Sequence, residues 1–154
     1  MKNPKLLAEK KIVDDLFKQI NSFTGDPFIK SLLTYYLCVR VSGFLENSVR
    51  TIFLDYSIPM SRGNVPTYIS NKLKKFPNPT WSAIIELATD YNKLWADNLK
   101  KTIKPSVPSA LDSINVNRNA IAHGSTSSIT IGDLTSYYND VLILIDELEN
   151  VCVY

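Results

Sequence analysis

The chain has 154 residues, 45% of them hydrophobic and 21% charged, with a formal net charge of +2, which is the composition of an ordinary soluble globular protein. Its length is most simply one domain, residues 1–154, long enough to bury roughly 68–70% of the surface of the unfolded chain. No apolar run reaches the roughly 18 residues of a membrane span, and the first residues lack a signal-peptide core. We therefore expect a cytoplasmic protein with no membrane partner.

Apolar residues recur at spacings of three and four along almost the whole chain, which predicts an all-α protein. The expected helices cover 5–22, 28–56, 67–76, 81–103, a stretch that ends at Gly124, and a last stretch from near Thr130. Proline-containing segments at 58–66, 77–80 and 105–108 are expected to be loops. The longest pattern, 28–56, holds its spacing without a proline, so we place it at the centre of a bundle of five to six helices. Thr130 and Asp133 form a variant of the capping box.

Several classes of site find no support in the sequence. The chain has one histidine and two cysteines, Cys38 and Cys152, which lie inside apolar helical patterns and are expected to be buried free thiols. The five glycines do not form a phosphate-binding loop, so ATP or GTP hydrolysis is not indicated. We therefore expect no metal and no cofactor.

The net charge hides an uneven distribution. Residues 61–104 contain eight Lys or Arg and three Asp or Glu, whereas residues 105–154 contain one Arg and six acidic residues. A basic segment of this kind attracts a polyanion such as RNA, or it is simply a solvated lysine face. The sequence favours neither interpretation.

The stretch around the only histidine carries the strongest chemical signal. Arg118, Asn119 and His123 stand before Gly124 at the expected C-terminal end of a helix. Asn119 and His123 lie about 40° apart on one face, whereas Arg118 and His123 diverge by about 140°. Either the last turn is distorted near Gly124, or Arg118 and His123 flank a cleft from its two sides. Arg118 also lies near the apolar stripe, where a guanidinium needs a carboxylate or phosphate partner.

These residue types suit the cleavage of RNA by its own 2′-hydroxyl. The reaction needs a base, an acid and a cation, and imidazole serves as base or acid near neutral pH while arginine stays charged and binds phosphate. One imidazole rarely serves as acid and base in the same step, so a two-fold dimer that joins two motif helices is expected. The alternative for His123 is a helix C-cap whose positive form favours the helix dipole.

A second feature lies in the longest helix. Ser42 and Glu46 form an i,i+4 pair, and an acidic residue within this apolar stretch needs a partner. Arg50 is the local choice, as a helix ion pair. The other choice is that Glu46 reaches Arg118 or His123 across the bundle and orients the site.

The pattern Arg118-Asn119-x-x-x-His123 at the end of a late helix resembles the Arg-x(4–6)-His signature of the HEPN superfamily, and Ser42-x-x-x-Glu46 is similar to its RiboL-PSP-type subgroup. The resemblance implies a HEPN-like all-α bundle, a homodimer with a composite site, and an RNA substrate. It further implies a metal-independent endoribonuclease of toxin or phage-defence type that leaves 2′,3′-cyclic phosphate and 5′-hydroxyl ends. Arg118, Asn119, His123 and Glu46 are then the catalytic set.

Two alternatives and one departure accompany the resemblance. The chain could be a non-catalytic HEPN module that binds a nucleotide or RNA or supports dimerisation, or a purely structural helical dimer with a buried Arg118–Glu46 pair. HEPN toxins paired with nucleotidyltransferase antitoxins often carry a tyrosine two positions after the histidine, whereas this chain has Ser125. This departure argues against regulation by tyrosine modification there, and in favour of another antitoxin, regulatory partner or trigger.

Overall fold

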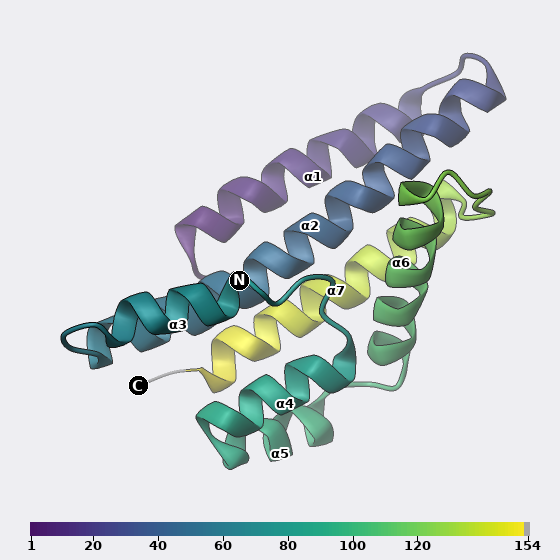
Figure 1. Ribbon diagram of the computed structural model, residues 1–154. Helices are drawn as coiled ribbons and strands as arrows, with labels where there is room; N and C mark the ends of the chain where they lie inside the picture. The colour runs from purple at the N-terminus through teal and green to yellow at the C-terminus, as the bar shows by residue number, and fades with distance from the viewer. Residues whose placement is uncertain (153–154) are drawn as a thin grey trace.

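The structure is a computed structural model that describes residues 1–152, and within that range it contains seven helices and no strands (Figure 1). The all-α prediction is confirmed. In chain order the helices are α1 (Pro4–Ser22), α2 (Pro27–Met60), α3 (Val65–Leu73), α4 (Trp81–Tyr91), α5 (Lys93–Thr102), α6 (Ser106–Ala122) and α7 (Ile131–Val151).

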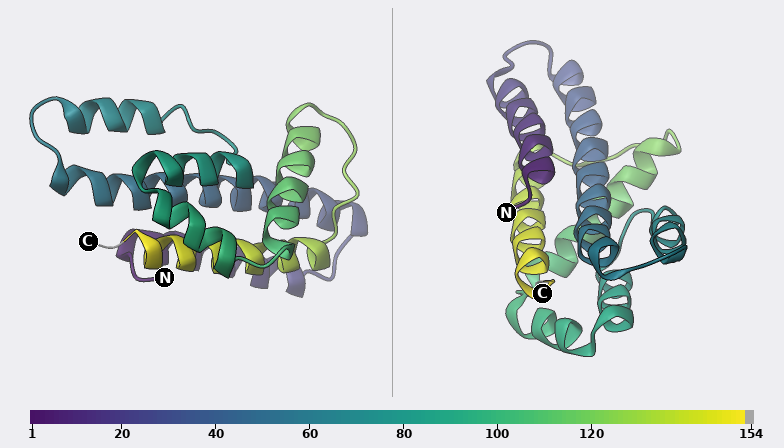
Figure 2. Two further views of the ribbon diagram at one scale, coloured as in Figure 1. Left: turned by 90° about the horizontal axis from the view of Figure 1, so that it is seen from below. Right: turned by 90° about the vertical axis from the view of Figure 1, so that its left-hand side faces the viewer.

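The long helix α2 is the centre of the fold, as predicted. It contacts α1, α3, α6 and α7, and Figure 2 shows α1 and α7 on one side of it and the free end of α6 on the other. Its buried face includes Leu37, Val41, Leu45, Val49 and Phe53. By length and composition alone α2 is also long and apolar enough to cross a membrane, a test that the buried core helix of a soluble protein passes as well.

The expected helix over 81–103 is two helices, which raises the number from the predicted five or six to seven. Asn92 has an extended backbone (φ −163°, ψ 116°), and its N–H donates to the carbonyl of Ala88 at the end of α4. Its side-chain oxygen accepts the N–H of Leu94 at 3.0 Å and so caps the start of α5. The apolar spacing continues on both sides of Asn92, so periodicity alone did not reveal the break.

The predicted boundaries of two proline-containing loops are wrong. Helix α2 continues through Pro59 to Met60, and α6 begins at Ser106 with Pro108 in its first turn. Proline is tolerated in a first turn because the N–H that it lacks has no partner there. Pro59 lies in the last turn of α2. The backbone hydrogen bond that proline cannot donate is therefore lost only near the end of the helix.

The predicted N-terminal cap of α7 is present in the structure. The N–H of Asp133 donates to Oγ1 of Thr130 at 3.1 Å, and the N–H of Thr130 donates to the Asp133 carboxylate at 3.2 Å. The capping box is therefore complete. Hydrogen bonds from Thr130 lower the pKa of the Asp133 carboxyl.

The two cysteines are free thiols, as predicted, although only Cys38 is fully buried and Cys152 is half-buried. Burial raises the pKa of Cys38 to about 11 and the pKa of Cys152 to about 12. Both thiols are therefore protonated and unreactive at neutral pH.

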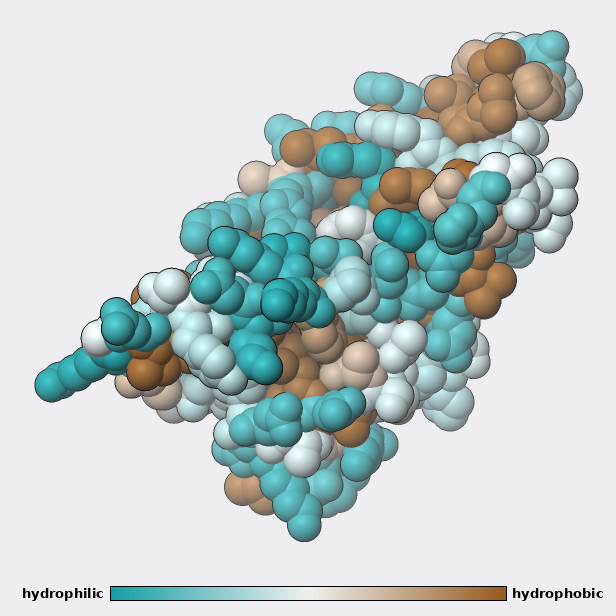
Figure 3. Space-filling model, viewed as in Figure 1, coloured by the Kyte–Doolittle hydropathy of each residue, from teal (hydrophilic) through white to brown (hydrophobic). Residues whose placement is uncertain are grey.

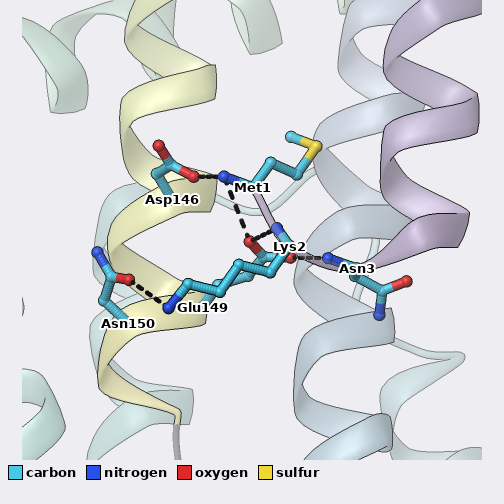
Figure 4. Close-up of polar contacts among 6 residues, drawn as sticks. All are labelled: Met1, Lys2, Asn3, Asp146, Glu149 and Asn150. Carbon is cyan, nitrogen blue, oxygen red and sulfur yellow. Dashed lines mark hydrogen bonds and ion pairs between the residues drawn. The ribbon is translucent and has the colours of Figure 1, made fainter.

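The first residues are tied to the last turns of α7 by polar contacts (Figure 4). The amino group of Met1 pairs with Asp146, and the backbone N–H groups of Lys2 and Asn3 donate to the Glu149 carboxylate at 2.5 and 2.9 Å. These contacts hold α1 against α7 beside the core.

Candidate active site

The motif lies at the C-terminal end of α6, as predicted, and the turn that follows it is a Schellman motif. The N–H of Ser125 donates to the carbonyl of Ala120 at 2.8 Å, and the N–H of Gly124 donates to Ile121 at 3.1 Å. Gly124 has φ +70°, the left-handed conformation that a side chain disfavours. His123 is the C-cap residue, and its own N–H bonds to the carbonyl of Asn119 at 3.0 Å.

The helix is regular up to Ala122, so the alternative of a distorted last turn is not what the structure has. Arg118 therefore lies on the half-buried side of α6, while Asn119 and His123 are exposed. Figure 2 shows this end of α6 standing away from α2 and α7, with the 123–130 connection returning to the bundle. The motif is open to a large ligand or to a second protein chain.

Arg118 keeps its charge free for a ligand. Its Nη1 donates to Oδ1 of Asn119 at 3.2 Å, and no carboxylate among residues 1–152 forms an ion pair with it. Asn119 and His123 share one face of the helix, but no hydrogen bond joins the Asn119 side chain to the His123 ring. Throughout the described chain the His123 side chain forms no hydrogen bond or ion pair.

Glu46 does not reach the motif directly. Its Oε1 accepts from Nη1 of Arg50 at 3.1 Å, and its Oε2 accepts the backbone N–H of Asn78 at 3.2 Å. The local partner considered above is thus the observed one. The buried Arg118–Glu46 pair of the purely structural alternative is not formed.

The chain matches the family model of RiboL-PSP-HEPN over residues 5–154. It belongs to the RiboL-PSP-HEPN family. HEPN domains are generally associated with ribonucleases. None of the curated proteins matches the chain, and none of the solved structures matches it.

Three residues that were not predicted hold the segment after the Arg118–His123 motif in place. Ser127 Oγ donates to Oδ1 of Asn117 at 2.7 Å and accepts the N–H of Ile129 at 3.3 Å. The hydroxyl of Tyr35 on α2 donates to the Ser127 carbonyl. Ser127 is ten residues from Asn117 and 92 residues from Tyr35 in the sequence. Local spacing therefore gave no signal for either contact.

A further residue that was not predicted is Asn115, one turn before Arg118. It is buried, with 8% of its surface exposed, and its Nδ2 donates to the carbonyl of Pro79 at 3.4 Å. Its Oδ1 is buried without a hydrogen-bond partner. A buried asparagine in the middle of α6 therefore binds the connection between α3 and α4.

The surface of the molecule is mixed in character. Lys72, Lys74 and Lys75 are exposed at the end of α3, and hydrophilic residues dominate the centre of the face seen in Figure 3. The same figure shows hydrophobic surface where α2 begins. Large exposed apolar side chains there and on α6 are Phe28, Leu32, Tyr36, Val39 and Val116.

No group of three or more His, Cys, Asp or Glu residues close enough to hold a metal ion occurs in the described part of the chain.

Proposed function

We propose that the chain is a metal-independent endoribonuclease that cleaves RNA at a site shared by two copies. The observation that carries the proposal is that Arg118 has no ionic partner among residues 1–152 and shares the protruding end of α6 with the exposed His123, in a family generally associated with ribonucleases. Arginine binds phosphate through a fork of donors, and a guanidinium without a carboxylate partner is suited to a phosphate.

In the proposed mechanism the RNA 2′-oxygen attacks the adjacent phosphorus. One imidazole takes the proton of the 2′-hydroxyl while the 2′-oxygen–phosphorus bond forms. The bond from phosphorus to the 5′-oxygen breaks, and a second imidazole donates a proton to that oxygen. Arg118 stabilises the extra negative charge on the phosphorane. The products are a 2′,3′-cyclic phosphate and a 5′-hydroxyl, and every proton is accounted for by imidazole.

The two imidazoles come from two chains, because each chain has a single histidine. A two-fold homodimer that joins the α6 ends supplies two His123 and two Arg118 to one cleft. Exposed apolar side chains on α2 and α6 support self-association of two copies. This surface lies on the same side of the molecule as the motif, because Tyr35 of α2 contacts the segment directly after the motif. In this scheme Asn119 positions Arg118, which donates to its side-chain oxygen, and Glu46 has an indirect positioning role.

The biological role that fits is a toxin or phage-defence effector acting on cytoplasmic RNA. An antitoxin, another regulatory partner or a trigger then controls the activity, since Ser125 replaces the tyrosine of HEPN toxins that are modified there. The exposed lysines of α3 suit the approach of a polyanion.

The test is RNA cleavage in EDTA by the wild-type chain and by His123→Ala, with chemical analysis of the product ends. Cyclic-phosphate ends that vanish in the variant are the expected result. Intact RNA with a folded wild-type dimer, in the presence of candidate activators, would overturn the proposal.

A second function is favoured by one observation: no side chain of the described residues orients the His123 ring. A non-catalytic HEPN module that binds RNA or a nucleotide, or that serves dimerisation, needs no such orientation. It is distinguished by RNA binding that survives His123→Ala without any cleavage product.

A further inference from the structure

We infer that Glu46 and Asn115 are positioning residues that clamp residues 77–79 between α2 and α6 and thereby fix the end of α6 that carries Arg118 and His123. The inference rests on the proposed function, because it concerns how the same site is held. It replaces the direct contact from Glu46 to the motif with an indirect one.

The clamp consists of two hydrogen bonds that meet on neighbouring residues. Glu46 on α2 accepts the N–H of Asn78 at 3.2 Å, and Asn115 on α6 donates to the carbonyl of Pro79 at 3.4 Å. Figure 1 shows the connection between α3 and α4 leaving the end of α3 and then turning down into α4. The Glu46 carboxylate on α2 is therefore linked to α6 through the N–H of Asn78 and the carbonyl of Pro79.

The clamped segment has an unusual backbone. Asn78 has φ +46°, and among the described residues it is the one non-glycine residue with positive φ. Asparagine tolerates this left-handed conformation better than most residues. Proline on both sides leaves the N–H of Asn78 as the single backbone donor of residues 77–79, and that donor is the one that Glu46 binds.

Asn115 is suited to its place by the donor that it supplies. The Pro79 carbonyl can only accept, so the group that faces it must donate, and aspartate in this buried place would put a carboxylate against a carbonyl oxygen. The buried Oδ1 of Asn115 has no hydrogen-bond partner. The bond to Pro79 is therefore the one hydrogen bond that the Asn115 side chain forms in the described chain. Asn115 is three residues before Arg118, so any shift of its turn carries directly to the motif.

The charge of Glu46 and its hydrogen bond to Asn78 can be separated by substitution. Glu46→Gln keeps an oxygen that can accept the Asn78 N–H, but it loses the ion pair with Arg50, whereas Glu46→Ala loses both contacts. Arg50→Gln removes the ion pair alone. Asn78→Gly keeps both clamp bonds, because they use backbone atoms, and it adopts positive φ easily. These last two variants are the matched controls.

The experiment measures kcat and KM for RNA cleavage together with amide hydrogen exchange in the full chain. We expect Glu46→Ala to lower kcat about tenfold with KM within about twofold, since small displacements of catalytic groups act on the chemical step. Glu46→Gln, Arg50→Gln and Asn78→Gly should stay near the wild-type kcat. Equal loss in the Gln and Ala variants of Glu46, or no loss in either, would overturn the clamp.

Hydrogen exchange tests the clamp even if the wild-type chain does not cleave RNA. The N–H groups of His123, Gly124 and Ser125 are hydrogen-bonded at the end of α6, so their exchange reports the order of this end. Glu46→Ala should speed exchange at these amides and at Asn78, and Glu46→Gln should not. Unchanged exchange in Glu46→Ala would refute the clamp, whereas faster exchange without any RNA cleavage would keep the clamp and reject the ribonuclease.

Asn115→Ala is expected to give the same pattern as Glu46→Ala in both measurements. Should this variant fail to fold, the Glu46 pair of variants decides the question alone. An Asn115→Ala chain that folds, with wild-type kcat and wild-type exchange at the α6 end, would also overturn the inference.

Discussion

The two halves of α6 follow different physical rules. In the first half Val107, Ala110, Leu111 and Ile114 are buried against the other helices. In the second half the helix leaves the bundle, and Asn119 and His123 are exposed while Arg118 has no ionic partner among residues 1–152. Packing therefore fixes the helix at its start, and the end is free to carry groups whose partners lie outside the chain. Substitutions in the two halves should separate stability from activity.

The largest expected effect on stability comes from the first half. Leu111→Ala removes a fully buried side chain and should lower the free energy of unfolding by about 2–5 kcal/mol, because a cavity remains. Denaturant unfolding measures this loss. A decrease below about 1 kcal/mol would mean that α6 does not depend on packing at its start.

Arg118→Ala is the matching substitution in the second half. It should lower RNA cleavage by about 10²–10³-fold, as expected when a donor to a developing negative charge is lost. The free energy of unfolding should change by about 0.5 kcal/mol or less, since no carboxylate is left unpaired. Loss of about 3–5 kcal/mol, as when a buried ion pair is broken, would instead show a structural role.

Gly124→Ala tests the one backbone requirement of the second half. A Cβ at Gly124 would meet nothing within 4 Å, so the expected cost comes from the positive φ alone, about 1–2 kcal/mol. Gly124→Asn should cost less, because asparagine tolerates this conformation. Equal destabilisation by both would show that crowding, rather than conformation, matters at this turn.

The smallest effect is a pH dependence at the start of α7. Hydrogen bonds from Thr130 hold the pKa of Asp133 below its ordinary value of 3.8 in the folded chain. The ionised carboxylate therefore stabilises the fold above pH 3.8, and this contribution is lost as the pH falls through the lower folded-state pKa. Asp133→Asn should show a flatter melting temperature in this acid range than the wild type, and an identical acid slope would contradict the capping role.

Local signals were sufficient for much of this fold. Gly124 ended the motif helix, and Thr130 with Asp133 started α7, because each acts on residues within one turn. Asn92 was missed since the apolar spacing continues across it, although its side chain ends one helix and caps the next.

The site was predicted less completely than the fold. Arg118, Asn119 and His123 were found by their spacing along one helix, and their roles stay predictions. Arg50 was one of the two partners considered for Glu46, but Asn78 was not found, because it is 32 residues away and binds through its backbone N–H. Asn115 was missed for the same reason, as its partner Pro79 is 36 residues away and supplies only a carbonyl. Contacts made by backbone atoms of a loop leave no residue pattern to detect.

In the proposed mechanism two chains share one site through their His123 side chains, and a mixing experiment tests this sharing. Wild-type chain is unfolded and refolded with increasing fractions of His123→Ala, and RNA cleavage in EDTA is measured at constant total protein. If both imidazoles are needed, an equal mixture should retain about one quarter of the wild-type activity, since only dimers of two wild-type chains are active. Retention of about one half would mean that each chain acts alone, and it would contradict the shared site.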